Sequence, residues 1–265
     1  MTLPSVARTL RSSAVLVRSV DYGEADRIVT LVTRSLGKIS AIARGARKSR
    51  SRFGAALASF VVGKATLAER RDLFELSAYT LVRDFTAVAR DVVGMAHASY
   101  GVELTRELSP PRQPEPALFE LIVELLDALC QAPPRAETLR GFELRLLEAA
   151  GLGPALDRCA ACGEPPRADV HTVDPGRGGI LCPRCAAAAP FSATPVRLAE
   201  GTRRRLLELA ARPLLEIARD ESPRDLDEEA AARQLTHGLL LPHLHAPLRS
   251  LEFLRQLRRA PGENV

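Results

Sequence analysis

Residues 37–53 read GKISAIARGARKSRSRF, a strand pattern that runs directly into a basic loop. In residues 38–44 the side chains alternate, so that Lys38, Ile42 and Arg44 share one strand face and the apolar residues 39, 41 and 43 share the other. Between residues 38 and 52 there are six cations and no acidic residue: Lys38, Arg44, Arg47, Lys48, Arg50 and Arg52. Because like charges repel, this density favours an anionic partner, with a solvated loop as the alternative.

Further short segments around this stretch show strand-like composition. They are rich in Val and Ile and are separated by turn sequences such as DYGEAD and RSLG. The segments are residues 14–20, 27–33, 60–67 and 74–82. Together with residues 38–44 they give five strands, and this number predicts an N-terminal OB-fold β-barrel over residues 1–82.

After residue 83 the apolar spacing becomes helical. In residues 116–130 six Leu and Ile side chains fall on one face, and Pro116 suits the first helical turn. Residues 138–150 repeat this pattern, and 88–107, 195–211 and 228–244 are further candidates. The sequence therefore predicts an α+β multidomain protein, with an α-helical domain over residues 83–265 that is interrupted by an insert at residues 156–192.

The insert carries four cysteines in two CxxC pairs, Cys159–Cys162 and Cys182–Cys185. Each pair supplies two thiolates from one turn, and four soft donors suit tetrahedral zinc. Disulfides fit less well, because the cysteine total is five and no secretory signal is visible. We expect one structural zinc ion per chain, and we expect the fifth cysteine, Cys130, to lie in a helix core.

Charge is unevenly distributed along the chain. Residues 1–80 hold 14 Lys and Arg against 6 Asp and Glu, although the whole chain has a net charge of only +5. Such asymmetry indicates one domain suited to an anionic partner. No apolar run approaches the roughly 20 residues that a membrane span needs. We expect a cytoplasmic, nucleoid-associated protein.

The motifs of common active sites are missing from the sequence. Lys38 and Lys64 each follow a glycine but lack the rest of a phosphate-binding loop, and there is no GxSxG, HExxH or His-x-Glu. We therefore expect no enzymatic activity and no small-molecule substrate. A zinc-dependent hydrolase or deaminase is the alternative, but four cysteines would leave zinc no open position.

The basic loop favours nucleic-acid binding through the phosphate backbone. Small Ser and Ala neighbours leave the cationic groups room to approach phosphates, and nothing in the loop suggests reading of base edges. A zinc-containing OB-fold RNA-binding or ribosome-associated factor stays open as an alternative. A second basic group near the C-terminus suits either helix-end solvation or a secondary contact with DNA or an acidic peptide; it consists of Arg249, Arg255, Arg258 and Arg259.

Three stretches, spread along the chain, resemble the RecO family of bacterial recombination mediators. They are GKISAIARGARKSRSRFGAALASF, the cysteine segment LEAAGLGPALDRCAACG with GGILCPRC, and LRSLEFLRQL. The resemblance implies an OB-fold, a helical domain and a zinc finger. It also implies a role in DNA repair and DNA recombination by the RecF-type pathway.

Partners and site residues follow from the same resemblance. It implies binding of single- and double-stranded DNA, strand annealing, and cooperation with RecR in loading RecA onto strands coated by single-strand-binding protein (SSB), whose acidic tail is also a partner. The family's basic motif falls on the six cations of residues 38–52, and its zinc ligands fall on Cys159, Cys162, Cys182 and Cys185.

Overall fold

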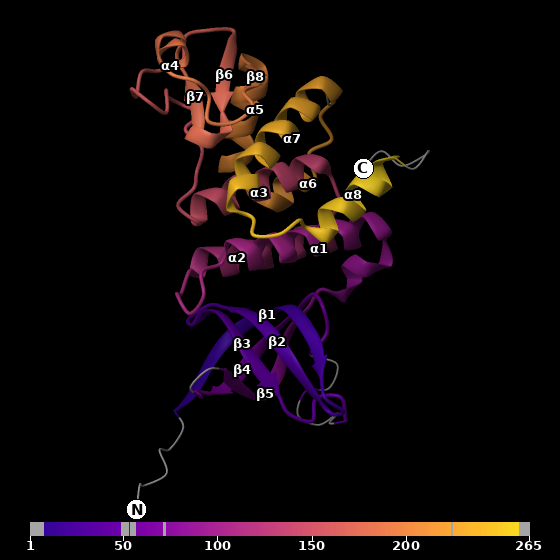
Figure 1. Cartoon of the computed structure of the whole chain (residues 1–265). Helices are drawn as coiled ribbons and strands as arrows, with labels where there is room; N and C mark the ends of the chain where they lie inside the picture. Colours follow the sequence, from indigo (N-terminus) through magenta and orange to yellow (C-terminus); the bar gives the residue numbers. More distant parts are fainter. Residues whose placement is uncertain (1–7, 49–52, 54–56, 71–72, 224, 260–265) are drawn as a thin grey trace, which may run out of the picture. The chain divides into compact units, whose positions relative to one another are not determined.

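The structure is a computed structural model that describes residues 8–48, 53, 57–70, 73–223 and 225–259. The chain divides into two compact units, residues 1–130 and 131–265 (Figure 1). The first unit groups the barrel with the two helices that follow it. The predicted domain ranges describe a change of secondary-structure type rather than this grouping by contact, and they stay a prediction.

The first unit begins with a closed five-stranded barrel in the order β1-β2-β3-β5-β4. All neighbouring strands are antiparallel except β3 and β5, which are parallel. The strands are β1 (Thr9–Tyr22), β2 (Asp26–Thr33), β3 (Gly37–Ala43), β4 (Val61–Ala68) and β5 (Phe74–Asp84). The five predicted strands and the OB-type barrel are therefore confirmed, and β1 extends further at both ends than predicted.

Alternation along the strands fills the barrel interior. On β3, Ile39, Ala41 and Ala43 are at most 3% exposed, whereas Ser40 on the opposite face is exposed. The predicted faces of this strand are thus confirmed. Val29 and Leu31 of β2 contribute to the same core, which the burial of apolar area stabilises.

A tyrosine ring lies across β4 where that strand has no side chain. The Tyr79 hydroxyl donates to the Ala14 carbonyl over 2.7 Å, and a Cβ atom added to Gly63 would lie 2.3 Å from the Tyr79 ring. Real Cβ atoms do not approach a ring so closely, so this position requires glycine. The pair ties β1, β4 and β5 together inside the barrel.

Two helices follow the barrel in the first unit, α1 (Val92–Leu108) and α2 (Pro116–Gln131), after a short 3-10 turn (Thr86–Arg90). Asp91 caps α1 by accepting from the Gly94 N–H over 2.6 Å. The apolar face predicted for α2 is buried, as Leu118, Ile122 and Leu125 show. Cys130 corrects the prediction of a core cysteine: it lies exposed near the end of α2, where its thiol donates to the Phe85 carbonyl.

The second unit is helical. Its helices are α3 (Ala136–Ala149), α5 (Glu200–Ala211), α6 (Leu214–Ala218), α7 (Leu226–Leu240) and α8 (Arg249–Arg259), and α3 packs against α5, α6 and α7. The predicted helix at 228–244 begins two residues earlier, as α7, and ends in a 3-10 turn, Leu241–His243. The second unit thus gives the helical part of the predicted fold class.

A small three-stranded sheet stands between α3 and α5 in the chain, in the order β7-β6-β8. Its elements are β6 (Val170–Asp174), β7 (Gly179–Leu181), the short helix α4 (Pro183–Ala188) and β8 (Val196–Ala199). The predicted helix over 195–211 was wrong at its start, because Val196 and Leu198 alternate into the core and pair with β6.

Candidate nucleic-acid interface and metal centre

The basic loop, residues 44–52, begins fixed to the turn between β1 and β2. The Gly45 N–H donates to the Asp26 carboxylate over 2.8 Å, and the Arg47 N–H donates to the Ala25 carbonyl over 3.0 Å. Gly45 adopts a φ of +67°, which a residue with a Cβ atom adopts only under strain. Backbone contacts between residues distant in sequence therefore set the start of the loop.

The cationic side chains at this end of the loop face solvent. Arg44 is 64% exposed, with its Nε 4.0 Å from the Glu75 carboxylate. Arg47 donates from Nη1 to the Gly23 carbonyl over 3.2 Å and lies 3.6 Å from Asp21, while Lys48 is exposed. These are the sequence-predicted cations that the structure brings together.

The residue that follows the basic loop is buried. Arg50 and Arg52 lie outside the described residues, but Phe53, which follows them, is only 2% exposed and belongs to the barrel core.

Lys38, predicted to contact DNA, makes a contact within the first unit. Its ammonium group donates to the Arg106 carbonyl over 2.7 Å, at the last turn of α1. Burial lowers the pKa of Lys38; the nearby Glu107 raises this pKa, and the charge of Arg106 lowers it further. This contact satisfies a helix C-terminal carbonyl that has no partner within the helix. The structure gives Lys38 a role in holding α1 to the barrel, and we do not include it among the proposed phosphate ligands.

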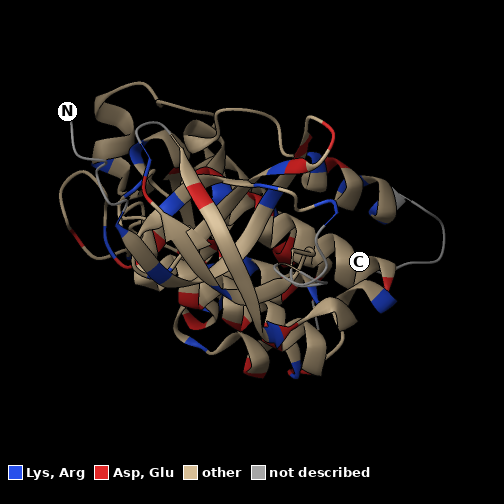
Figure 2. Cartoon of the chain, turned by 90° about the horizontal axis from the view of Figure 1, so that it is seen from below, with Lys and Arg blue, Asp and Glu red and all other residues tan. Residues whose placement is uncertain are grey.

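Other cations lie on the first unit. Figure 2 colours Lys and Arg blue and shows them on both strands and loops. Exposed examples on the barrel strands and turns are Arg11, Arg18, Arg34, Lys64 and Arg83. Two of these cations are paired with carboxylates, Arg34 with Glu120 and Arg83 with Asp127.

The C-terminal arginines are spread along α8. Arg249 and Arg255 are exposed, and Arg255 donates to His237 Nε2 over 3.2 Å. Arg258 is half-buried, and burial, followed by the nearby charges of Arg233 and Arg140, lowers its pKa. The side chain of Arg259 lies outside the described residues.

The four predicted metal ligands come together in the insert. The sulfurs of Cys159, Cys162, Cys182 and Cys185 all lie within 4.8 Å of one another, and those of Cys162 and Cys182 are 3.7 Å apart. A tetrahedral site with metal–sulfur bonds of about 2.3 Å places its sulfurs about 3.8 Å apart. The four residues therefore could hold one metal ion.

Local backbone bonds shape both halves of this cluster. Gly163, with a φ of +77°, donates to the Cys159 carbonyl over 2.8 Å and closes the first turn. The second pair stands at the start of α4, where the Cys182 N–H donates to the Cys159 sulfur over 3.3 Å. Burial raises the pKa of Cys159, but N–H donors from Cys182 and the first turn outweigh it and lower that pKa to about 6. A thiol that ionises readily suits metal binding.

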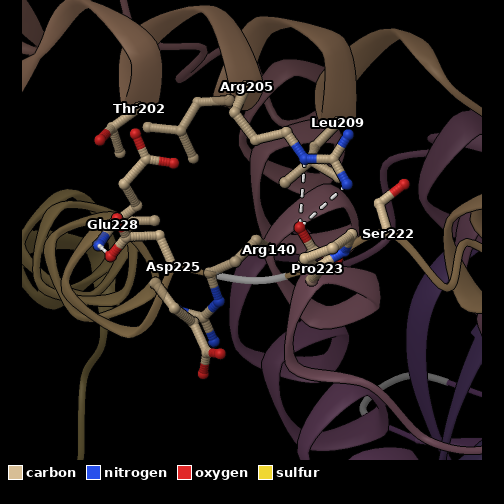
Figure 3. Close-up of a pocket in the computed structure, with 12 residues that line it drawn as sticks. Arg140, Thr202, Arg205, Leu209, Ser222, Pro223, Asp225 and Glu228 are labelled. Atoms are coloured by element: carbon tan, nitrogen blue, oxygen red, sulfur yellow. Dashed lines mark hydrogen bonds and ion pairs between the residues drawn. The ribbon is translucent and has the colours of Figure 1, made fainter.

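The second unit also contains a cavity of about 270 Å³ between α3, α5 and α7 (Figure 3). Figure 3 shows Arg205 directed across it, and its guanidinium donates to the Glu137 carboxylate over 2.9 and 3.1 Å. Arg140, on the other side, binds Glu143 and Thr236. The two cations of this cavity are thus engaged with neighbouring helices, and none of the sequence-predicted site residues lines it.

Two family models match most of the chain. The family models described as "Recombination protein O N terminal" and "Recombination protein O C terminal" match residues 7–85 and 89–252. The chain belongs to the RecO family. It therefore has a role in DNA repair and recombination, and the RecO resemblance stated from the sequence is confirmed.

Relatives from three bacteria show how much of the chain this likeness covers. The chain is 43% identical to the DNA repair protein RecO of Anaeromyxobacter sp. (strain K), over 94% of this chain and 96% of the relative. The RecO protein of Myxococcus xanthus is 38% identical over 92% of this chain and 96% of its own length. The RecO protein of Geobacter sulfurreducens is also 38% identical, over 94% of this chain and 98% of its own length. Family membership favours DNA over the RNA alternative.

Sequence reasoning missed the residues that position the basic loop. Asp21 and Asp26 belong to the turn sequence DYGEAD, where they read as ordinary turn residues. Their contacts with Arg47 and Gly45 span about 20 residues of sequence, and no local pattern signals them. Among the described residues, no helix combines the length and apolar character required to cross a bilayer.

Proposed function

We propose that this RecO family member binds single- and double-stranded DNA and anneals complementary strands without enzymatic activity. With RecR it would help RecA load onto SSB-coated single strands, at the nucleoid. The observation that carries the proposal is the basic loop, fixed at its start to the β1–β2 turn and followed by the buried Phe53, on an OB-fold barrel. OB-folds commonly bind oligonucleotides on the face of strands β2 and β3 and on the β1–β2 and β4–β5 loops, and the start of the basic loop is bonded to the β1–β2 turn.

The mechanism is electrostatic. The proposed phosphate ligands are Arg44, Arg47, Lys48, Arg50 and Arg52. Two complementary strands repel each other through their phosphates, and a cationic surface that neutralises both lowers this repulsion. Phosphate contacts carry no sequence information, so binding should be similar for all sequences.

The metal is proposed to be zinc, one ion per chain, held by Cys159, Cys162, Cys182 and Cys185. Four thiolates would complete its coordination, so that zinc would supply folding energy rather than catalysis. The insert depends on such a staple because its strands are only three to five residues long.

A second contact is proposed on α8, for DNA or for the acidic tail of SSB. The residues are Arg249, Arg255, Arg258 and Arg259. Burial is the main cause of the lowered pKa of Arg258, followed by the charges of Arg233 and Arg140, while Glu143 and Glu229 raise it. An anion at this place would relieve the repulsion between the arginines.

Annealing tests the proposal directly. Two complementary oligonucleotides are coated with SSB, the protein is added without ATP, and duplex formation is followed by fluorescence energy transfer. Acceleration that fades as salt rises supports the mechanism, and the variant Arg47→Glu/Lys48→Glu should lose much of it. No acceleration by folded, zinc-loaded protein, or tighter binding to structured RNA than to single-stranded DNA of equal length, would refute the proposal.

A further inference from the structure

The outer face of β1, β2 and β3 carries apolar side chains that face solvent. Tyr22 is 56% exposed and Val20 is 46% exposed, both at the end of β1. Val20 stands opposite Ile28 of β2, and Ile28 stands opposite Ile42 of β3; both isoleucines are partly exposed. We call these four residues the outer strip. Side chains directly opposite on neighbouring strands lie within contact distance of one another, so the strip is one continuous surface.

The outer strip adjoins the start of the basic loop. Tyr22 directly precedes Gly23, whose carbonyl accepts from the Arg47 guanidinium. Asp26, opposite Tyr22 in the strand register, accepts from the Gly45 N–H. The exposed ring of Tyr22 thus adjoins the turn to which the Arg47 side chain is bonded. The turn also carries three acidic residues, Asp21, Glu24 and Asp26, and Arg47 lies 3.6 Å from Asp21.

A single-stranded nucleic acid matches this combination of groups. Its phosphates need cations and its bases need flat apolar partners, and both requirements are met on neighbouring residues. The closed OB-type barrel and the DNA-repair role of the RecO family favour nucleic acid over a membrane or a protein partner. The charge and the ring together point to one occupant.

Stacking within a duplex leaves no base face free for Tyr22. Bases of one strand in a duplex are about 3.4 Å apart, and each internal base is stacked between two neighbours. The bases of a single strand can separate from one another, so that one face is free to stack on an aromatic side chain.

We propose that Tyr22 is a base-stacking residue and that the outer strip makes this protein bind single-stranded DNA more tightly than duplex DNA. The proposal rests on the proposed DNA-binding function and goes beyond it, since it adds a base contact to an interface made otherwise of phosphate contacts. Arg44, Arg47 and Lys48 bind phosphates of either DNA form. Tyr22 contacts only bases that are unstacked.

Intrinsic fluorescence gives a direct readout. The chain has no Trp and three Tyr, of which Tyr79 and Tyr100 are each only 2% exposed. Base stacking on Tyr22 should quench the tyrosine emission when an oligo-dT strand is added, and a duplex should not. In the variant Tyr22→Phe the quenching should disappear while the affinity for oligo-dT is retained, since Phe stacks as Tyr does.

Affinity gives the second readout. Tyr22→Ala should weaken oligo-dT binding roughly 5- to 100-fold and leave duplex binding unchanged. Phe191→Ala is the matched control, because it removes an aromatic ring that is 39% exposed in the cysteine insert. Since Tyr22 faces solvent, Tyr22→Ala should melt at the wild-type temperature, and this is checked before binding is measured.

The outcomes separate this proposal from the one on which it rests. If the wild type binds oligo-dT but Tyr22→Ala binds it equally well, the stacking role is wrong and the DNA-binding function stands. If Tyr22→Ala weakens single-strand and duplex binding alike, the ring does not discriminate between them and the proposal is overturned. If the wild type does not bind oligo-dT at all, the proposed function fails first. A dimer that Tyr22→Ala converts to a monomer with unchanged DNA binding would make the strip a self-association surface instead.

Discussion

Neutralising two cations of the basic loop should reduce the salt dependence of DNA binding by a calculable amount. Each phosphate contact contributes about −0.7 to the log–log salt slope for a single strand and about −0.9 for a duplex. Because Lys38 binds the Arg106 carbonyl, five of the six predicted cations remain, which gives a slope of about −3.5 for a single strand. The variant Arg47→Gln/Lys48→Gln should reduce its magnitude by about 1.4 for a single strand and about 1.8 for a duplex.

Lys38→Gln is the informative control for this experiment. It removes a charged hydrogen bond to the end of α1, and such bonds contribute about 1.5–3 kcal/mol. The melting temperature should therefore fall while the salt slope stays at the wild-type value. Anisotropy of a labelled oligonucleotide over a series of KCl concentrations gives the slopes, and thermal melting gives the stabilities.

Two results would refute the reasoning. A Lys38→Gln variant whose slope flattens by about 0.7 for a single strand would restore Lys38 to the phosphate ligands. An Arg47→Gln/Lys48→Gln variant with an unchanged slope would remove the basic loop from the interface and leave the arginines of α8 as the next candidates.

Three further predictions concern stability. Gly63→Val should strongly lower the melting temperature of the first unit, because its Cβ would collide with the Tyr79 ring; wild-type melting would contradict this packing. The insert should unfold when a chelator removes the metal or when Cys159 is replaced in Cys159→Ser. Unfolding would be seen as faster amide exchange in the insert, and oligo-dT binding should stay unchanged. Unaltered amide exchange would rule out a structural metal. Hydrogen bonds from Arg203 and His171 lower the pKa of Glu200 to about 2. Their contribution to the stability of the folded protein is therefore fully present above the usual carboxyl pKa of about 4.3, and it is lost as the pH falls towards 2. Glu200→Gln should therefore reduce the acid sensitivity of melting, and an unchanged pH profile would contradict the pairing.

The local patterns of the sequence predicted much of the fold. Short Val- and Ile-rich segments between turn sequences, with alternation in residues 38–44, identified all five barrel strands, and the apolar face of α2 was predicted residue by residue. The CxxC spacing predicted which four cysteines gather. These features depend on residues close together in the chain, where side-chain period and turn chemistry decide the conformation.

Predictions failed where a distant partner decided the outcome. Residues 196–199 have a spacing that suits a helix, but β6 offers them backbone partners and they form β8 instead. Cys130 belongs to an apolar helix stripe, yet it stands exposed near the end of that helix. In both cases the local sequence pattern permits more than one environment, and a residue far away in the chain supplies the partner: β6 for residues 196–199, and the Phe85 carbonyl for Cys130.

For the candidate site, the sequence by itself determined the kind of residues: a dense group of cations after a strand, and four thiols in two pairs. Only the tertiary structure decided which of them act together. The Lys38 side chain bonds to α1, the start of the loop bonds to Asp26 and Ala25, and the Arg47 guanidinium bonds to the carbonyl of Gly23, the residue after Tyr22. The physical reason is that charge and local period are properties of neighbouring residues, whereas the partner of a side chain is set by closure of a barrel that joins residues far apart in the chain.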